Sequence, residues 1–299
     1  MPPGKRAPEA EHEIEEMSRL NDWRATRARW LNRLHARLAA RARPSQGFVV
    51  QPEPRTIGFR ARGRQLIAGN LLFAGHLVEA PGQMIWDVAM PDEAFRDALH
   101  GFTWLDDLAA VGDVQARTLA QSWLWGWIDR YGRGKGPGWT PELTGRRVIR
   151  WLHHGLLLLR ATDADQARRY HQSMAAQTRF LAARAQGAAP GLPRFEALTG
   201  QLYAALSLEG LERYVDPARR GLLAECARQI DETGGIPTRS PEDLLEVFTL
   251  LTWAQLAFDQ AGHQPDSVLK EAIGRVAPTL RAMRHADGGL ARFHGGGRG

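Results

Sequence analysis

Cysteine is almost absent from this sequence: its 299 residues include only Cys226. A single cysteine excludes an internal disulfide bond and a cysteine-rich zinc site, so packing alone must hold the fold. Cys226 lies on an apolar helical face, which favours a small buried residue over a nucleophile. No motif for a cofactor or a metal ion is found elsewhere, and we expect neither.

Long hydrophobic runs are also absent, although 43% of the residues are hydrophobic and 24% are charged, as in ordinary globular proteins. No stretch reaches the eighteen or so apolar residues that a membrane-spanning helix needs. The first twenty residues contain no apolar run of the signal-peptide type. We therefore expect no transmembrane segment and a cytoplasmic location.

The positive charge is unevenly placed. The net charge is +6, and residues 1–46 hold ten Lys and Arg against six Asp and Glu, so most of the excess lies there. A DNA- or RNA-binding protein usually concentrates its basic residues on a folded surface with a recognisable motif, and no zinc finger, aromatic RNA-binding pattern or recognition helix is present. We therefore expect no nucleic-acid partner.

The basic N-terminal segment has a helical pattern from about Glu13 to Arg43. Tryptophan and leucine residues recur near one side, and arginines spaced by four residues lie on another. Three interpretations are open: a helix docked on the main domain, a helix that binds a partner, and a helix that lies on a membrane surface.

The rest of the chain changes character twice. Residues 47–90 contain short apolar pieces broken by Gly and Pro, which predicts short strands or irregular structure packed on the main domain. From Pro91 onward, prolines recur at positions typical of a first helical turn, with caps before them or acids after them. The predicted helices span residues 92–111, 114–131, 141–160, 164–186, 193–212, 217–232, 241–261 and 265–284.

The starts at 92, 141, 193 and 241 recur at about the length of an antiparallel helical hairpin. Many of the helices are apolar over a wide arc and must be buried on more than one side. A ring of hairpins, with inner helices wrapped by outer ones, meets this requirement. We therefore predict an all-α fold, an incomplete α/α toroid of about four helical hairpins, preceded by the short β-containing segment and the N-terminal helix.

Four stretches resemble the N-terminal toroid of heparinase II/III-like proteins, a family of bacterial polysaccharide lyases: ALHGFTWLDDLAAVGD, WLWGWI, WTPELTGRRVIRWLHH and GGIPTRSPEDLLEVFTLL. The resemblance runs from about Gly58 to the end and rests on the ordered set. In that family a β-sandwich domain follows the toroid, and DGGLARFHGGG is similar to the junction. The resemblance thus implies a toroid over 91–285 and, at 286–299, the start of a β-sandwich domain that is missing here. It also implies a periplasmic or cell-envelope location, as an alternative to the cytoplasm.

The resemblance further implies an acidic, uronate-containing polysaccharide as partner and its cleavage by β-elimination. Such chemistry needs a group that stabilises charge on the uronate carboxylate and a base that removes a proton. The family takes an Asn-His element and a Tyr from the toroid, but the matching stretch here has neither Asn nor His. Gln201 is the candidate to neutralise the carboxylate and Tyr203 the candidate acid or base; the alternatives are a solvated or capped glutamine and a packed core tyrosine.

Residues that would hold the polysaccharide are also predicted. Three of them, Arg147, Arg150 and His154, lie on the helix predicted over 141–160. His153 and His154 are adjacent on this helix and point about 100° apart, so only one of the two can face a ligand. A tryptophan next to a glycine-rich loop suits sugar stacking, and loop residues often bind ligands. The candidates are Arg147, Arg150, His154, Trp139, Arg239 and His294; ordinary surface charge or core packing is the alternative for each.

Two functions follow. One is the toroid part of a polysaccharide lyase, inactive or weakly active without its second domain. The other is a non-catalytic helical module that binds glycan or protein. A third class, an α/α-barrel glycoside hydrolase, needs paired carboxylates. Asp106 and Asp107 are neighbours on a helix and diverge, so they cannot form the pair. A pair that converges from different helices is not excluded by the spacing of residues, so this class stays open.

Overall fold

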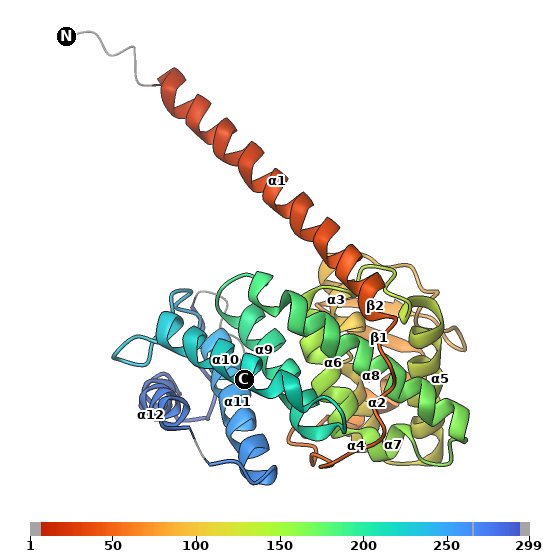
Figure 1. The fold of residues 1–299 in the computed structure, drawn as a ribbon. Coiled ribbons are helices and arrows are strands. Elements are labelled where there is room, and N and C mark those ends of the chain that lie inside the picture. The colour runs from red at the N-terminus through yellow and green to blue at the C-terminus, as the bar shows by residue number, and fades with distance from the viewer. Residues whose placement is uncertain (1–6, 265, 294–299) are drawn as a thin grey trace, which may run out of the picture.

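Helices form almost all of the structure, a computed structural model that describes residues 7–264 and 266–293 (Figure 1). The fold is all-α, an incomplete α/α toroid with a single small β-hairpin among the described residues. The longer helices are α1 Ala7–Ala39, α5 Val114–Tyr131, α6 Pro141–His153, α8 Ala164–Arg184, α9 Leu192–Ser207, α10 Val215–Gln229, α11 Pro241–Gln260 and α12 Ser267–Ala282. The short ones are α2 Arg60–Ile67, α3 Glu93–His100, α4 Trp104–Val111 and α7 Gly155–Leu158, with 3₁₀ turns η1 Ala185–Gly187 and η2 Glu212–Tyr214.

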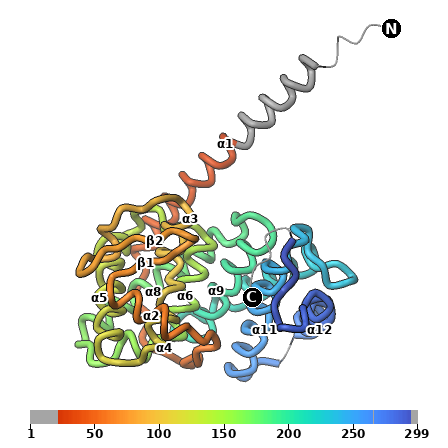
Figure 2. The backbone as a smooth tube through the Cα atoms, turned by 180° about the vertical axis from the view of Figure 1, so that it is seen from behind, coloured from red at the N-terminus to blue at the C-terminus, as the bar shows by residue number. Residues whose placement is uncertain are grey.

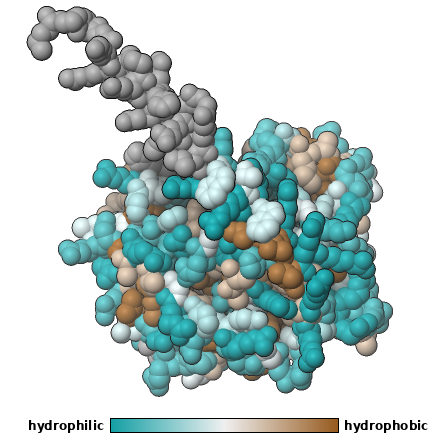
Figure 3. All heavy atoms as spheres, turned by 45° about the horizontal axis from the view of Figure 1, so that its top comes forward, coloured by the Kyte–Doolittle hydropathy of each residue, from teal (hydrophilic) through white to brown (hydrophobic). Residues whose placement is uncertain are grey.

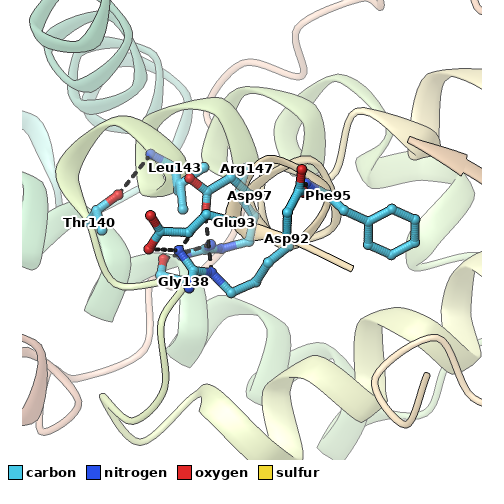
Figure 4. Close-up of polar contacts among 9 residues, drawn as sticks. Asp92, Glu93, Phe95, Asp97, Gly138, Thr140, Leu143 and Arg147 are labelled. Carbon is cyan, nitrogen blue, oxygen red and sulfur yellow. Dashed lines mark hydrogen bonds and ion pairs between the residues drawn. The ribbon is translucent and has the colours of Figure 1, made fainter. Parts of the chain in front are cut away.

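The helix starts follow from local capping chemistry. The Asp92 carboxylate accepts a hydrogen bond from the Phe95 amide at 2.7 Å, and the Thr140 hydroxyl accepts one from the Leu143 amide at 3.4 Å (Figure 4). Pro141 then occupies the first turn of α6, where its missing N–H leaves no hydrogen bond unmade. Ser240 caps α11 in the same way. The predicted starts at 92, 141 and 241 are thus correct to within one residue.

Two predicted helices are each interrupted. The helix expected over 92–111 is divided into α3 and α4, because Phe102 between them has a φ of 60°, which no continuous right-handed helix allows. The helix expected over 141–160 stops at His153 and resumes as α7. Both interruptions place side chains of the second piece in new directions, and sequence periodicity did not reveal them.

Three long helices, α6, α9 and α11, follow one another as the central row of the toroid, and α8, α10 and α12 lie against them. Helices α6 and α9 make the most extensive contact, because two glycines face each other where they cross. A Cβ added to Gly145 would lie 2.2 Å from the backbone oxygen of Glu196, and one added to Gly200 would lie 2.5 Å from the Gly145 Cα. Only glycine lets the two backbones approach this closely.

The segment between α1 and α3 runs across the body. Its hairpin pairs β1 Asn70–Phe73 with β2 His76–Glu79 in antiparallel register. Upstream of the hairpin, Phe48 forms an isolated β-bridge with Leu208, and the Gly58 backbone passes directly over α4. These elements agree with the predicted short strands and irregular structure, but the helix α2 in the same segment was not predicted. Figure 2 shows the segment from behind, where it covers the part of the body formed by α4, α5 and α6.

Helix α1 leaves the body at an angle, and only its C-terminal end is packed (Figures 1 and 2). Ala36 and Ala39 are buried there, and the Arg184 guanidinium of α8 donates a hydrogen bond of 2.8 Å to the Asn32 side chain. In contrast, Trp23 and Trp30 are 61% and 59% exposed. The helix therefore docks through small alanines at its C-terminal end, and its tryptophans at 23 and 30 are left in solvent.

The core is rich in aromatic residues. Trp104, Trp127 and Trp151 are fully buried and pack around Phe102 with ring centroids 4.6 to 6.3 Å apart. Figure 3 looks at the body from the side on which α1 leaves it, where hydrophilic side chains dominate and hydrophobic ones form small separate patches. Across the described residues, no helix combines the length and the apolar character required to cross a bilayer.

Candidate functional site

The two predicted catalytic residues lie inside α9, and both have partners in the fold. Tyr203 is 2% exposed, and its hydroxyl donates a hydrogen bond of 3.0 Å to the Trp253 carbonyl of α11. Burial also raises the pKa of the phenol above its ordinary value, which makes it a poorer base at neutral pH. The Gln201 amide donates to the Tyr214 carbonyl at 3.3 Å. The Tyr203 hydroxyl is thus bound within the fold, and Gln201 is 3% exposed.

Arg147 lies in the core. It is completely buried, and its guanidinium donates to the Gln177 side chain at 2.7 Å and to the His100 carbonyl at 2.9 Å. It also donates to the Gly138 carbonyl at 3.1 Å (Figure 4). The guanidinium carbon also lies 4.0 Å from the centre of the Trp127 ring. Burial lowers its pKa well below the ordinary value. A residue so enclosed cannot reach a polysaccharide, which corrects the expectation of a substrate contact.

Trp139 is likewise a core residue, with 3% of its surface exposed. Its indole N–H donates to the Tyr131 carbonyl at 2.8 Å, and its ring packs edge-on against Phe180 with centroids 5.3 Å apart. Sugar stacking requires an open aromatic face, and this ring has none. The glycine-rich loop that precedes Trp139 therefore seats its ring inward instead of presenting it.

The other two candidates from α6, Arg150 and His154, meet the same carboxylate. Asp106 on α4 accepts a contact of 2.7 Å from His154 Nε2 and one of 3.3 Å from Arg150 Nε, and all three side chains are mostly buried. Burial alone would raise the pKa of Asp106, but the hydrogen bond from His154 and the charge of Arg150 hold that pKa below its ordinary value. The sequence did not pair these residues, because 44 and 48 positions separate them from Asp106.

His153 points away from this carboxylate, as the 100° separation of neighbours on a helix requires. Its ring packs edge-on against Tyr203 and Trp253 with centroids 5.4 and 5.2 Å apart, and neither ring nitrogen has a hydrogen-bond partner. Burial, together with the neighbouring His154, lowers its pKa to about 3, so the ring is neutral at pH 7. It is the described histidine nearest to Tyr203, and sequence reasoning had set it aside in favour of His154.

A second ion pair joins α6 to α9. The Arg146 guanidinium binds one carboxylate oxygen of Glu196, and the other oxygen is buried without a hydrogen-bond partner among the described residues. Burial raises the pKa of Glu196 to about 7 even though Arg146 opposes the change. Glu246 of α11 lies close enough to add its own repulsion. Sequence reasoning missed Glu196, since its nearest charged partner is 50 positions away.

The remaining candidates are separate from these pairs. Arg239 lies in the loop before α11 and has a φ of 53°, an uncommon value for a residue with a side chain. It is exposed and stays a predicted binding residue. His294 lies outside the described residues.

An open cavity of about 330 Å³ borders Asp106 and Asp107, between α2, β1 and α4. Asp107 also lines this cavity, but its carboxylate already accepts a hydrogen bond of 2.7 Å from the Phe59 amide. Burial raises the pKa of Asp107, opposite to the shift of Asp106. The two carboxylates diverge, as expected, and bind different partners, so they do not form the facing pair of a glycosidase.

The charged side chains of α4, α6 and α9 described above neutralise one another in pairs. Asp106 is bound to Arg150 and His154, and Glu196 is bound to Arg146, so these cations hold acidic side chains instead of standing free for a uronate. Within the described part of the chain, no three His, Cys, Asp or Glu side chains group closely enough to hold a metal ion. These ion pairs connect the helices α4, α6 and α9 to one another.

Comparison with known proteins gives two kinds of similarity. No protein-family model matches the chain. The chain is 31% identical over 290 residues to the FtsZ-localized protein C of Caulobacter vibrioides (strain NA1000 / CB15N), which matches 92% of this chain and 49% of that protein. The chain therefore spans about half the length of this relative.

The fold is similar to that of solved polysaccharide lyases. Heparinase III superimposes on 84% of this chain with a TM-score of 0.62, and the heparan sulfate lyase HepC of Pedobacter heparinus on 88% with a TM-score of 0.59. Both are only 14% identical to this chain, which covers 43% and 45% of them. The chain thus has a heparinase-like toroid fold, as predicted, while the shared residues are too few to carry over an activity.

Proposed function

We propose that this chain is a non-catalytic binding module built on a heparinase-like toroid, and that it localises with FtsZ. The observation that carries the non-catalytic part is the hydrogen bond from Tyr203 to the Trp253 carbonyl. This hydrogen bond occupies the hydroxyl of Tyr203, the one tyrosine proposed for proton transfer, and the side chain is almost completely buried. The missing Asn-His element supports the same conclusion.

Localisation with FtsZ is supported by the relative in Caulobacter vibrioides, whose name states it. The similarity extends over 92% of this chain, so it includes most of the toroid. We place a protein-binding role on α1, because Trp23, Trp30, Leu34 and Leu38 are exposed along a helix that is packed only at its end. The cytoplasmic location expected from the sequence belongs to this proposal.

The experiment is co-sedimentation of the full chain with FtsZ polymers, compared with a form lacking residues 1–45. We expect the full chain to enter the pellet with FtsZ and the shortened form to remain in the supernatant. The double variant Trp23→Ser/Trp30→Ser tests the exposed face without removing the helix. A matched control is Val114→Ser, which removes an exposed hydrophobic residue from α5. Equal pelleting of every form would remove α1 from the role, and no pelleting of the full chain would end the FtsZ proposal.

A second candidate is binding or weak cleavage of a uronate-containing acidic polysaccharide on the face that carries Asp106, Arg150 and His154. The fold shared with heparinase III and HepC supports it. The test follows the ultraviolet absorbance of the unsaturated uronate product during incubation with heparin, heparan sulfate, chondroitin, hyaluronan and alginate. A rise that Tyr203→Phe abolishes would restore the lyase function. Retarded migration in gels that contain one of these polysaccharides, with no rise, would mean glycan binding alone.

A further inference from the structure

We infer that four arginines around one surface pocket form a binding site for a phosphorylated ligand that carries at least two negative charges. The pocket has a volume of about 490 Å³ and lies where three segments meet: the chain just after α1, the middle of α8, and the loop between α9 and α10. We call it the arginine pocket; its arginines are Arg41, Arg43, Arg179 and Arg213.

The charge of the pocket is not balanced from within. Glu209 is the only acidic residue in its lining, against the four arginines. Among the described residues, none of these four guanidinium groups forms an ion pair with a carboxylate. This differs from the face described above, where Asp106 and Glu196 already hold the arginines of α6. Uncompensated guanidinium groups converging on one concave surface attract an anion.

The framework that carries the arginines is fixed by hydrogen bonds. The Gln172 side chain of α8 donates to the carbonyls of Ala40 and Ala42, which ties the chain after α1 to α8. Further along, the Val49 amide donates to the Ser207 carbonyl at 2.8 Å and the Glu209 amide to the Gly47 carbonyl at 3.1 Å. Segments far apart in the sequence are thus held at the rim before any ligand arrives, which lowers the entropy that binding costs.

Neutral groups of the lining complete the site. Ser45 is buried, and its hydroxyl lies 2.9 Å from His171 Nδ1, so the hydroxyl is oriented. The Arg213 guanidinium lies over the Tyr214 ring, 4.8 Å from its centre, and donates to the Tyr214 hydroxyl at 3.1 Å. These contacts hold Arg213 in one orientation, with its remaining N–H groups available for ligand oxygens.

The geometry favours phosphate over a long polysaccharide. A guanidinium group binds two oxygens of a phosphate at once, and several of them around a compact volume suit a group with concentrated charge. The volume lies within the range of about 300 to 1,000 Å³ that is usual for sites of small ligands. A polysaccharide chain would need an extended groove, whereas this pocket is a compact surface hollow bordered by three segments.

The test is calorimetric titration of the full chain with sodium pyrophosphate at low ionic strength. We expect binding, and at least about a tenfold loss of affinity in Arg179→Gln/Arg213→Gln, because each lost guanidinium removes charge-assisted hydrogen bonds. The matched control, Arg133→Gln/Arg220→Gln, removes two exposed arginines elsewhere and should bind as the unchanged chain does. Arg179→Lys/Arg213→Lys keeps the charge and loses the forked geometry, so its affinity should fall between the two.

No measurable binding of pyrophosphate to the unchanged chain would overturn the inference. An equal loss in the control variant would do the same, because it would mean attraction by net charge alone. Vesicles of phosphatidylcholine with phosphatidic acid carry the same phosphate group on a surface. Binding of pyrophosphate and vesicles that both depend on Arg179 and Arg213, with tighter binding of the vesicles, would identify a lipid headgroup as the source of the phosphate; tighter binding of pyrophosphate would identify a soluble compound.

Discussion

The Tyr203 hydroxyl of α9 donates a hydrogen bond of 3.0 Å to the Trp253 carbonyl of α11, so a residue proposed for catalysis joins two neighbouring helices of the toroid. Removal of that hydroxyl should therefore cost stability. We expect Tyr203→Phe to lower the free energy of unfolding by about 1 kcal/mol, the usual contribution of one buried hydrogen bond. Urea unfolding followed by circular dichroism measures it.

Tyr214→Phe is the comparison for this variant, since its hydroxyl bonds an exposed arginine and its loss should change stability little. If Tyr203→Phe kept full stability and lost glycan binding, the hydroxyl would have to serve a ligand instead of the fold.

Asp106 should be among the costliest carboxylates to neutralise. Asp106→Asn leaves the largely buried Arg150 and His154 without their anion, and breaking a buried pair on one side costs about 3 kcal/mol or more. The control is Asp87→Asn, which breaks a bidentate but exposed pair with Arg130 and should change stability far less, because solvent screens an exposed pair. Similar losses in both variants, measured by urea unfolding, would contradict the role assigned to the Asp106 cluster.

Glu196 should make stability depend on pH. Burial raises its folded-state pKa from 4.5 to about 7, so the folded protein binds a proton more tightly than the unfolded chain between these values. Stability should therefore decrease as pH rises from 4.5 to 7, by an amount on the order of 1 to 3 kcal/mol from this group. Glu196→Gln removes the titration, and its curve of unfolding free energy against pH should be flatter in that interval. A curve parallel to that of the unchanged chain would show that Glu196 titrates normally.

Replacement of glycine by alanine should have opposite effects at the crossing of α6 and α9 and on the open face of α12. Gly145→Ala would place a Cβ 2.2 Å from a backbone oxygen of α9, so the helices must separate and stability should fall by more than about 2 kcal/mol. Gly274→Ala in α12 meets nothing within 4 Å and should stabilise the protein by about 0.5 to 1 kcal/mol through helix propensity. Thermal unfolding of the two variants tests both; a neutral Gly145→Ala would mean that the crossing is looser than the structure shows.

Much of the fold was predictable because its signals are local. Thr140-Pro141 and Ser240-Pro241 encode a cap and a first turn within a few residues, and the structure has helix starts there. The toroid followed from helices of repeated length that are apolar over wide arcs. By comparison, the Phe102 break depends on a backbone angle that no periodicity expresses.

The candidate site was less predictable, because its pairings connect distant positions. Arg147 and Arg150 look equivalent in the sequence, yet Arg147 packs against Trp127 and Arg150 lies beside Asp106. The arginine pocket is lined by residues 41–46, by Arg179 of α8 and by residues 209–214, and only the folded chain brings these segments together. The spacing of residues in the sequence cannot distinguish a buried or paired arginine from an unpaired one at the surface. The structure distinguishes them by the partners that each guanidinium group has.

In the proposed binding role, the length of helix α1 would set the position of its partner. A helix of 33 residues is about 50 Å long, and only its last turns are fastened to α8. A helix transmits orientation along its axis far better than a flexible linker does. A partner bound at Trp23 and Trp30 would therefore be held at a set distance and angle from the toroid, which makes α1 a spacer as well as a point of attachment.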